Sequence, residues 1–185
     1  DSWPKWEKNF LNICGDKYSG KTHLSNIFLK RFNGIRIDSH SFKDENLKQL
    51  KIFNNIVLDN FDNDIDERLI YTLFNIVDQD NKYLIINSIN PINLIDFKLA
   101  DLKSRTKNCL FAKIDKPDDE LMFALILKNF SDRQIMIDKK LIDFIIKKIE
   151  RSYGKIFEFI YKIDEISLKK KKPIDLKIIK EVLEE

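Results

Sequence analysis

The sequence predicts an α/β fold, in which a five-stranded parallel sheet with flanking helices precedes a smaller all-helical subdomain. Three observations predict it. Short apolar runs alternate with amphipathic segments over the first two thirds of the chain, a glycine-containing turn separates the first such pair, and only helical patterns follow Lys116. Such alternation is typical of parallel sheets covered by helices. We therefore expect a sheet domain over residues 1–116 and a helical domain over residues 117–185.

The expected strands are short apolar runs, and Ile56–Asp59 has the composition of a strand that is buried on both faces. The first helix is indicated by the helical spacing of Leu24, Ile27, Phe28 and Arg31. A polar stretch from Ser39 to Asn46 follows the second strand. The five expected strands are Leu11–Cys14, Ile35–Asp38, Ile56–Asp59, Tyr83–Asn87 and Cys109–Ile114. The three expected helices among them are Lys21–Phe32, Ile65–Val77 and Leu99–Arg105.

The helical part begins at Lys116-Pro117-Asp118-Asp119-Glu120, because proline and acidic residues favour the first turn of a helix. Its four expected amphipathic helices are Leu121–Phe130, Asp138–Ile149, Tyr153–Leu168 and Asp175–Leu183. The block Lys169–Lys172 has two interpretations. A solvated helix end is favoured over contact with DNA phosphates, because cations stabilise the C-terminal ends of helices.

The composition describes a globular protein and excludes several classes of function. The 185 residues carry 33 basic and 30 acidic side chains, and this net charge of +3 is too small to argue for nucleic-acid binding by itself. Cys14 and Cys109 lack the spacing of metal ligands, so we expect reduced core residues. Without an apolar run of membrane-spanning length or a secretory leader, we expect a cytoplasmic protein. The start at Asp1 indicates that an N-terminal piece is missing.

The glycine-containing turn carries the chemistry of the chain. It reads Gly15-Asp16-Lys17-Tyr18-Ser19-Gly20-Lys21-Thr22, which matches the phosphate-binding loop (P-loop) pattern G-x-x-x-x-G-K-[ST] between a strand and a helix. The two glycines let backbone N–H groups point at phosphate oxygens. Lys21 is expected to reach the terminal phosphates and Thr22 to bind Mg²⁺. With only 4 glycines in the chain, a chance match is disfavoured.

Two polar residues at strand ends are candidates for the same site. Asp59 ends the third apolar strand, where a P-loop protein needs a carboxylate for Mg²⁺, although a turn-capping aspartate is the alternative. The next residue is Asn60, an amide that cannot act as a general base, so hydrolysis by this chain is expected to be weak at most. Asn87 ends the fourth strand beside the P-loop strand. It is either a polar sensor of the γ-phosphate or an ordinary turn residue before Pro91.

Arg105, in Asp101-Leu102-Lys103-Ser104-Arg105, is the most consequential basic residue. It lies at a helix end just before the last strand, an edge of the sheet that can face a neighbouring subunit. An arginine supplied there in trans stabilises charge on a transferring phosphate and is worth roughly 10³ to 10⁵ in rate. A surface salt bridge is the alternative interpretation.

Together these residues resemble a known family. Gly20-Lys21-Thr22-His23-Leu24, Leu58-Asp59-Asn60, the Asn87-Ser88 turn and the Arg105 segment, followed by a helical lid, are similar to the DnaA/Hda-type AAA+ family of bacterial replication initiators and their regulators. The resemblance is strongest to the Hda-type regulators. It covers nearly the whole chain, ends where an initiator would continue into a helix-turn-helix domain, and includes Asn60, where the initiators have a second acid.

The resemblance implies a regulator that binds ADP or ATP with Mg²⁺ at the junction of the two domains. It would associate with DnaA and with the DNA-loaded sliding clamp, the latter through an N-terminal segment not seen here, and present Arg105 to ATP held by DnaA. Self-association and weak or indirect DNA contact also follow from it. The lid arginine of the family falls at Gly154, so Arg151 or Lys155 is the candidate substitute, with helix capping as the alternative role.

Without the resemblance, His23 is expected to be an exposed helix residue. We assign it no separate role and group it with the predicted nucleotide-binding residues. Only Trp3, Pro4 and Trp6 resemble the approach to the first strand. Two alternatives to the regulator stay open. One is an AAA+ initiator or helicase-loader ATPase fragment without its DNA-binding domain. The other is a nucleotide-locked assembly module without catalytic contribution.

Overall fold

The computed structural model describes residues 7–184 and contains two compact units. One unit comprises the chain up to Gly15 together with Gly20–Ile114, and the other comprises Asp16–Ser19 together with the chain from Asp115 onwards. Trp3, Pro4 and Trp6 lie outside the described residues. Within the described part, no helix is both long enough and apolar enough to cross a membrane.

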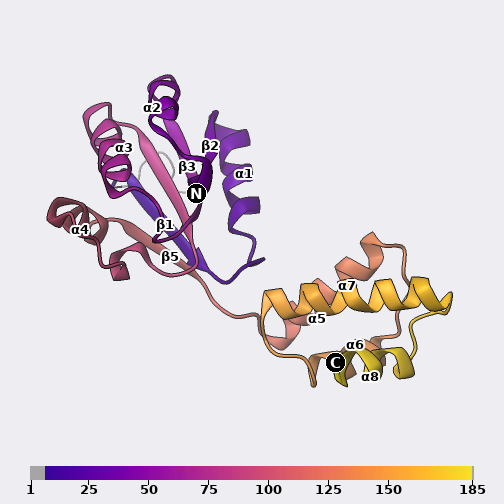
Figure 1. Ribbon diagram of the computed structural model, residues 1–185. Coiled ribbons are helices and arrows are strands. Elements are labelled where there is room, and N and C mark those ends of the chain that lie inside the picture. The colour runs from indigo at the N-terminus through magenta and orange to yellow at the C-terminus, as the bar shows by residue number, and fades with distance from the viewer. Residues whose placement is uncertain (1–6, 185) are drawn as a thin grey trace. The chain divides into compact units, whose positions relative to one another are not determined.

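The first unit is a five-stranded parallel sheet in the order β2-β3-β4-β1-β5, which confirms the predicted fold class (Figure 1). Each expected strand is present, with ends that differ from the expected ones by a few residues at most. The strands are β1 Phe10–Gly15, β2 Gly34–Asp38, β3 Asn55–Phe61, β4 Tyr83–Ser88 and β5 Leu110–Ile114. The position of β1 between β4 and β5 explains its apolar sequence, because an interior strand of a parallel sheet is covered on both faces.

Helices cover the two faces of this sheet unequally. Alternate side chains of a strand point to opposite faces, so Val57 packs with Phe28 and Leu29 of α1, whereas Ile56 and Leu58 belong to the larger core on the other face. Figure 1 shows α1 on one side of the sheet and α3 on the other. The helices of this unit are α1 Lys21–Phe32, α2 Asp44–Leu50, α3 Glu67–Gln79 and α4 Ala100–Lys107, and two 3₁₀ turns, η1 Ser39–Ser41 and η2 Ile92–Leu94, complete it.

Two features of these helices were not predicted. Leu24 and Ile27 helped to predict α1 by their spacing, but they are 48% and 51% exposed, and the buried position of the helix is Ser25. The polar stretch expected after β2 contains the start of α2. Acidic residues occupy its first turn, and the Asn46 side chain accepts a hydrogen bond from Lys43 N, so polar residues here begin a helix.

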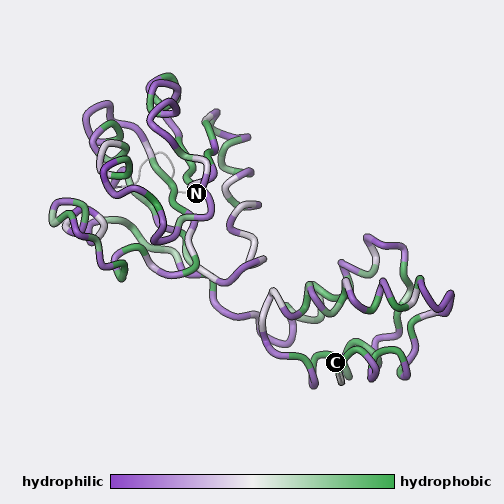
Figure 2. The backbone as a smooth tube through the Cα atoms, viewed as in Figure 1, coloured by the Kyte–Doolittle hydropathy of each residue, from purple (hydrophilic) through white to green (hydrophobic). Residues whose placement is uncertain are grey.

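The second unit consists of four helices around a core of its own, as predicted. They are α5 Asp119–Asp132, α6 Lys139–Ile146, α7 Tyr153–Lys170 and α8 Leu176–Glu184. Asp118 caps α5 by accepting a hydrogen bond from Leu121 N, which explains the acidic start signal. In Figure 2 hydrophobic and hydrophilic stretches alternate along these helices, as amphipathic helices around a shared core require.

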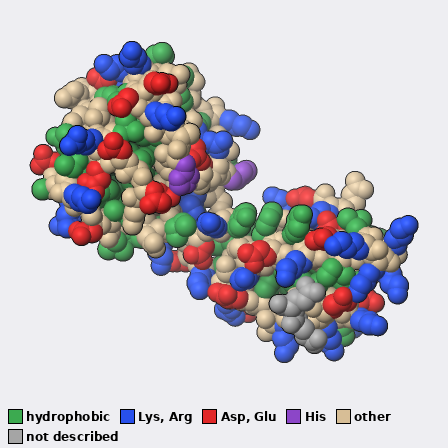
Figure 3. Space-filling model, viewed as in Figure 1, with side chains coloured by type: hydrophobic (Ala, Val, Ile, Leu, Met, Phe, Trp, Pro, Cys, Tyr) green, Lys and Arg blue, Asp and Glu red, His purple; other side chains and the backbone are tan. Residues whose placement is uncertain are grey.

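The charged side chains do not form a basic surface on the face shown in Figure 3, where acidic and basic groups are interspersed. The lysine block is the end of α7, and two of its members pair with acids: Lys169 with Glu165 and Lys170 with Glu181, at 2.6 Å each. The favoured interpretation of this block as a helix end is thereby supported. Cys14 and Cys109 are both buried, and burial raises the pKa of the Cys109 thiol to about 12.

Candidate functional site

The P-loop motif lies where β1 passes into α1. Gly15 ends the strand, and Gly20, with φ of 93°, precedes the helix in the left-handed region that glycine adopts without strain. Because Gly20 has no side chain to cap α1, the first N–H groups of the helix are not capped by the residue that precedes them. Lys21 Nζ donates a hydrogen bond to Gly15 O at 2.6 Å, so the lysine is folded over the loop.

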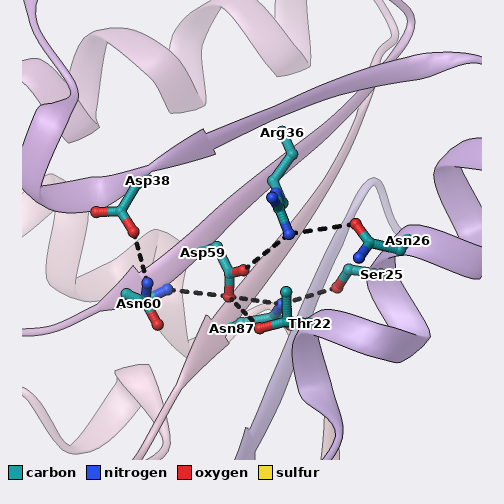
Figure 4. Close-up of polar contacts among 8 residues, drawn as sticks. All are labelled: Thr22, Ser25, Asn26, Arg36, Asp38, Asp59, Asn60 and Asn87. Atoms are coloured by element: carbon teal, nitrogen blue, oxygen red, sulfur yellow. Dashed lines mark hydrogen bonds and ion pairs between the residues drawn. The ribbon is translucent and has the colours of Figure 1, made fainter.

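The Asp59 carboxylate accepts hydrogen bonds from Thr22, Asn87 and Asn60 (Figure 4). Its Oδ1 accepts hydrogen bonds from Thr22 Oγ1 at 3.3 Å, from Asn87 Nδ2 at 3.1 Å and from Asn60 N at 3.1 Å. The residue is only 5% exposed. The strand order explains the convergence, because β4 lies between β3 and β1 and Asn87 pairs in register with Ile13 of the P-loop strand.

Asn87 is fully buried and only partly satisfied. Its Nδ2 also donates to Ser25 Oγ at 2.8 Å, whereas its Oδ1 has no hydrogen-bond partner among the described residues. Buried polar atoms are nearly always paired. The unpaired Asn87 Oδ1, beside Thr22 and Asp59, is therefore consistent with a site that binds a polar ligand or its water.

The donor set also fits Mg²⁺. Thr22 offers a hydroxyl oxygen and Asp59 a carboxylate, the hard oxygen ligands that this ion prefers. No cluster of three or more His, Cys, Asp or Glu side chains among residues 7–184 is arranged to hold a metal by itself. A magnesium ion at Thr22 and Asp59 would therefore complete its shell with water and phosphate oxygens, as is usual for this ion.

Asn60 takes part in the site in an unexpected way. It stands in the left-handed region with φ of 57°, where the register between β3 and β4 shifts, and its side chain donates to Asp38 Oδ2 at 2.5 Å. Ser39 Oγ in turn donates to Asn60 O at 2.6 Å. The amide at this position therefore holds the end of β2 against β3.

Arg105 lies in the last turn of α4, as its place in the sequence predicted. Its guanidinium forms an ion pair and hydrogen bond with Asp78 of α3 and lies over the Tyr71 ring, 5.5 Å from its centre. Since α4 ends just before β5 begins, Arg105 lies near the N-terminal ends of the strands. The P-loop follows the C-terminal end of β1, so Arg105 and the P-loop lie at opposite ends of the parallel strands.

The remaining predicted residues are placed as follows. His23 is exposed on α1. Asp16, Lys17, Tyr18 and Ser19 group with the helical unit, where the Tyr18 and Phe157 rings stack with centres 4.6 Å apart. Arg151 precedes α7 and pairs with Asp119 at 2.8 Å, and Lys155 of α7 pairs with Glu158 at 3.0 Å.

Two residues that support the site were not predicted. Asn12, fully buried in β1, donates to Ile86 O at 2.9 Å and Ser88 Oγ at 2.8 Å, and accepts from Ile92 N at 3.0 Å. Arg36 of β2 approaches Asp59 Oδ2 at 3.8 Å. A polar residue inside an apolar strand was the available signal for Asn12; none in the sequence pointed to Arg36.

We expect Asn12→Leu to lower the free energy of unfolding of the sheet unit by about 1–3 kcal/mol, because it leaves the buried Ile92 N–H without its acceptor. Urea unfolding followed by fluorescence measures the change. The exposed Asn63→Leu is the matched control and should move the midpoint little. An equal shift in both variants would show that the buried network contributes nothing specific.

The comparisons with known proteins show which sequences and folds this chain resembles. No protein-family model matches the sequence. DnaA of Thermoanaerobacter sp. is 26% identical over 200 residues, which cover 96% of this chain but 45% of that protein. The crystal structure of domain III of Thermotoga maritima DnaA superimposes with a TM-score of 0.76 at 20% identity, over 96% of this chain and 84% of that one. The chain is similar in sequence to DnaA and has the fold of DnaA domain III.

Two further matches are a protein other than DnaA with the same fold and a relative that is shorter than DnaA. The Thermotoga maritima RuvB branch migration motor shares the fold at 15% identity, with a TM-score of 0.70 over 95% of this chain and 61% of that one. An uncharacterized protein of Haemophilus influenzae is 25% identical over 190 residues, which are 94% of this chain and 81% of that protein. The chain thus spans about half of the DnaA proteins it matches and most of the shorter relative.

Proposed function

We propose that this chain is an adenine-nucleotide-binding regulator of replication initiation. In this proposal ADP or ATP, with Mg²⁺, holds the chain in the form that associates with DnaA. The chain then presents Arg105 to ATP bound by DnaA, and hydrolysis of that ATP switches the initiator off. Association with the DNA-loaded sliding clamp, through an N-terminal segment, is part of the same proposal.

The arrangement around α1 supports the nucleotide part. We expect the N–H groups at the start of α1 and the Lys21 ammonium to bind phosphate oxygens, and Thr22 and Asp59 to hold Mg²⁺. When bound, Mg²⁺ bridges and neutralises phosphate oxygens. Solved structures of DnaA, including that of Aquifex aeolicus, contain AMPPCP, an ATP analogue, which supports an adenine nucleotide as the ligand.

The position of Arg105 is the observation that carries the regulatory part. It lies at the edge of the sheet opposite the P-loop of its own unit, where it has no access to a phosphate bound there. We therefore propose that Arg105 acts on a phosphate that is bound by a partner protein. Asn60 supports the same view, because an amide bonded to Asp38 cannot activate water for hydrolysis within the chain. The Haemophilus influenzae relative, which consists mostly of the matching region, supports a protein of this kind without the rest of DnaA.

The second candidate is an AAA+ initiator or helicase-loader ATPase of which this chain is a piece. The 45% coverage of DnaA favours it. This candidate predicts ATP hydrolysis by the chain's own P-loop in an assembled oligomer, with Arg105 acting on a second copy of the same chain. A nucleotide-locked assembly module predicts hydrolysis in neither setting.

The test is to mix the chain with DnaA, sliding clamp and primed DNA, and to follow the ATP carried by DnaA. The regulator proposal expects loss of that ATP to accelerate only when the chain is present. Acceleration of the chain's own ATP turnover, with the ATP on DnaA unchanged, would favour the ATPase fragment. No acceleration of either would leave only the assembly module.

A further inference from the structure

The two oxygens of the Asp59 carboxylate have different neighbours. Oδ1 faces the hydrogen-bond donors of the predicted site, whereas Oδ2 faces Arg36 Nη1 at 3.8 Å (Figure 4). The Asp59 side chain is 7% exposed and that of Arg36 is 43% exposed, so a buried carboxylate faces a partly exposed guanidinium. A buried carboxylate without a counter-charge is costly, and Arg36 provides this charge from the protein itself.

Arg36 is fixed by the framework of the site. It stands on β2, which pairs with β3, and its Nη1 also donates to Asn26 Oδ1 at 3.2 Å. Asn26 follows Thr22 by one turn of α1, on the P-loop helix. The guanidinium therefore ties the helix that carries Thr22 to the strand that carries Asp59, and it approaches the pair of residues expected to hold Mg²⁺ from the β2 side.

We propose that Arg36 is a positioning residue that compensates the charge of Asp59 and thereby sets how strongly nucleotide binding depends on Mg²⁺. This inference rests on the proposed nucleotide site. A fixed cation beside a carboxylate repels a second cation and weakens its binding. With Arg36 in place, Asp59 is oriented and neutralised before any ion arrives, so Mg²⁺ adds less to nucleotide affinity than it would at a bare carboxylate.

The experiment measures the affinity for a fluorescent ADP analogue across a Mg²⁺ titration that starts from excess EDTA. In Arg36→Gln the Mg²⁺ concentration that gives half of the Mg²⁺-dependent gain should fall by roughly tenfold, because one nearby positive charge is removed. Arg36→Lys keeps the charge and should stay near the wild type. Arg68→Gln removes an exposed positive charge elsewhere in the same unit and is the matched control.

Three results would overturn the inference. One is an unchanged Mg²⁺ midpoint in Arg36→Gln. Another is a loss of affinity that is equal with and without Mg²⁺, which indicates a purely structural role. The third is an Arg36→Lys variant that behaves as Arg36→Gln does, which removes charge as the cause. Failure of the wild type to bind the analogue at any Mg²⁺ concentration would instead refute the nucleotide site itself, so the two proposals fail distinguishably.

Discussion

Lys21→Ala is expected to weaken the binding of ADP and ATP by about 100-fold, since hydrogen bonds between charged groups are worth roughly 1.5–3 kcal/mol each. This ammonium donates a hydrogen bond to Gly15 O, at the start of the loop that is expected to bind the phosphates. A ligand with several phosphate oxygens offers it stronger, charge-assisted partners. Isothermal titration calorimetry with each nucleotide, in the presence of Mg²⁺, measures the loss.

Lys30→Ala is the matched control for this experiment, because it removes an exposed lysine from the far end of the same helix. Its affinity should equal that of the wild type, and thermal unfolding should be similar in both variants. If Lys21→Ala binds nucleotide as the wild type does, the assignment of Gly15–Thr22 as a phosphate-binding loop is wrong. The proposed role of Asp59 would then lose its basis too.

Arg105→Ala should abolish the acceleration of DnaA-bound ATP hydrolysis, a fall of roughly 10³-fold if the guanidinium stabilises the transferring phosphate. Its nucleotide affinity should not change, because Arg105 lies at the opposite edge of the sheet from the P-loop. Single-turnover hydrolysis on DnaA measures the first quantity and titration the second. Arg105→Lys should restore little, because an ammonium lacks the planar fork of donors that suits a phosphate.

The pairing of Arg105 with Asp78 makes the control for this variant important. Asp78 is left without its cation in Arg105→Ala, but both side chains are partly exposed, so the pair is worth at most about 1 kcal/mol of stability. Lys107→Ala changes an exposed cation in the same last turn of α4 and should stimulate hydrolysis normally. Equal loss in the two variants would point to a damaged α4 surface instead of a specific arginine.

The parts of the fold that local patterns determine could be predicted. The five strands and the four helices of the second unit each depend on residues close together in sequence, and all are present. The short helix α2 was missed because its seven residues contain too few apolar positions to show a helical period. Leu24 and Ile27 correctly predicted α1 by their spacing, but they are about half exposed, whereas the buried Ser25 of this helix contacts Asn87.

The long-range contacts of the site could be predicted only in part. Asp59 and Asn87 were predicted as site residues from their positions at strand ends, and their side chains form a hydrogen bond of 3.1 Å. Arg36, by contrast, becomes part of the site only through the pairing of β2 with β3, and an arginine in an alternating strand gives no local sign of its partner. The pair between Arg105 and Asp78 likewise depends on the packing of α3 against α4, which the sequence pattern does not specify.

The most direct test of the regulatory proposal follows the ATP that DnaA itself carries. DnaA is loaded with labelled ATP, freed of excess nucleotide, and mixed with clamp-bound DNA and with this chain in complex with unlabelled ADP. The proposal predicts that the label is converted to ADP much faster with the wild-type chain than without it, and that Arg105→Ala gives the rate of DnaA alone. Label that remains ATP in the presence of the wild-type chain would contradict it.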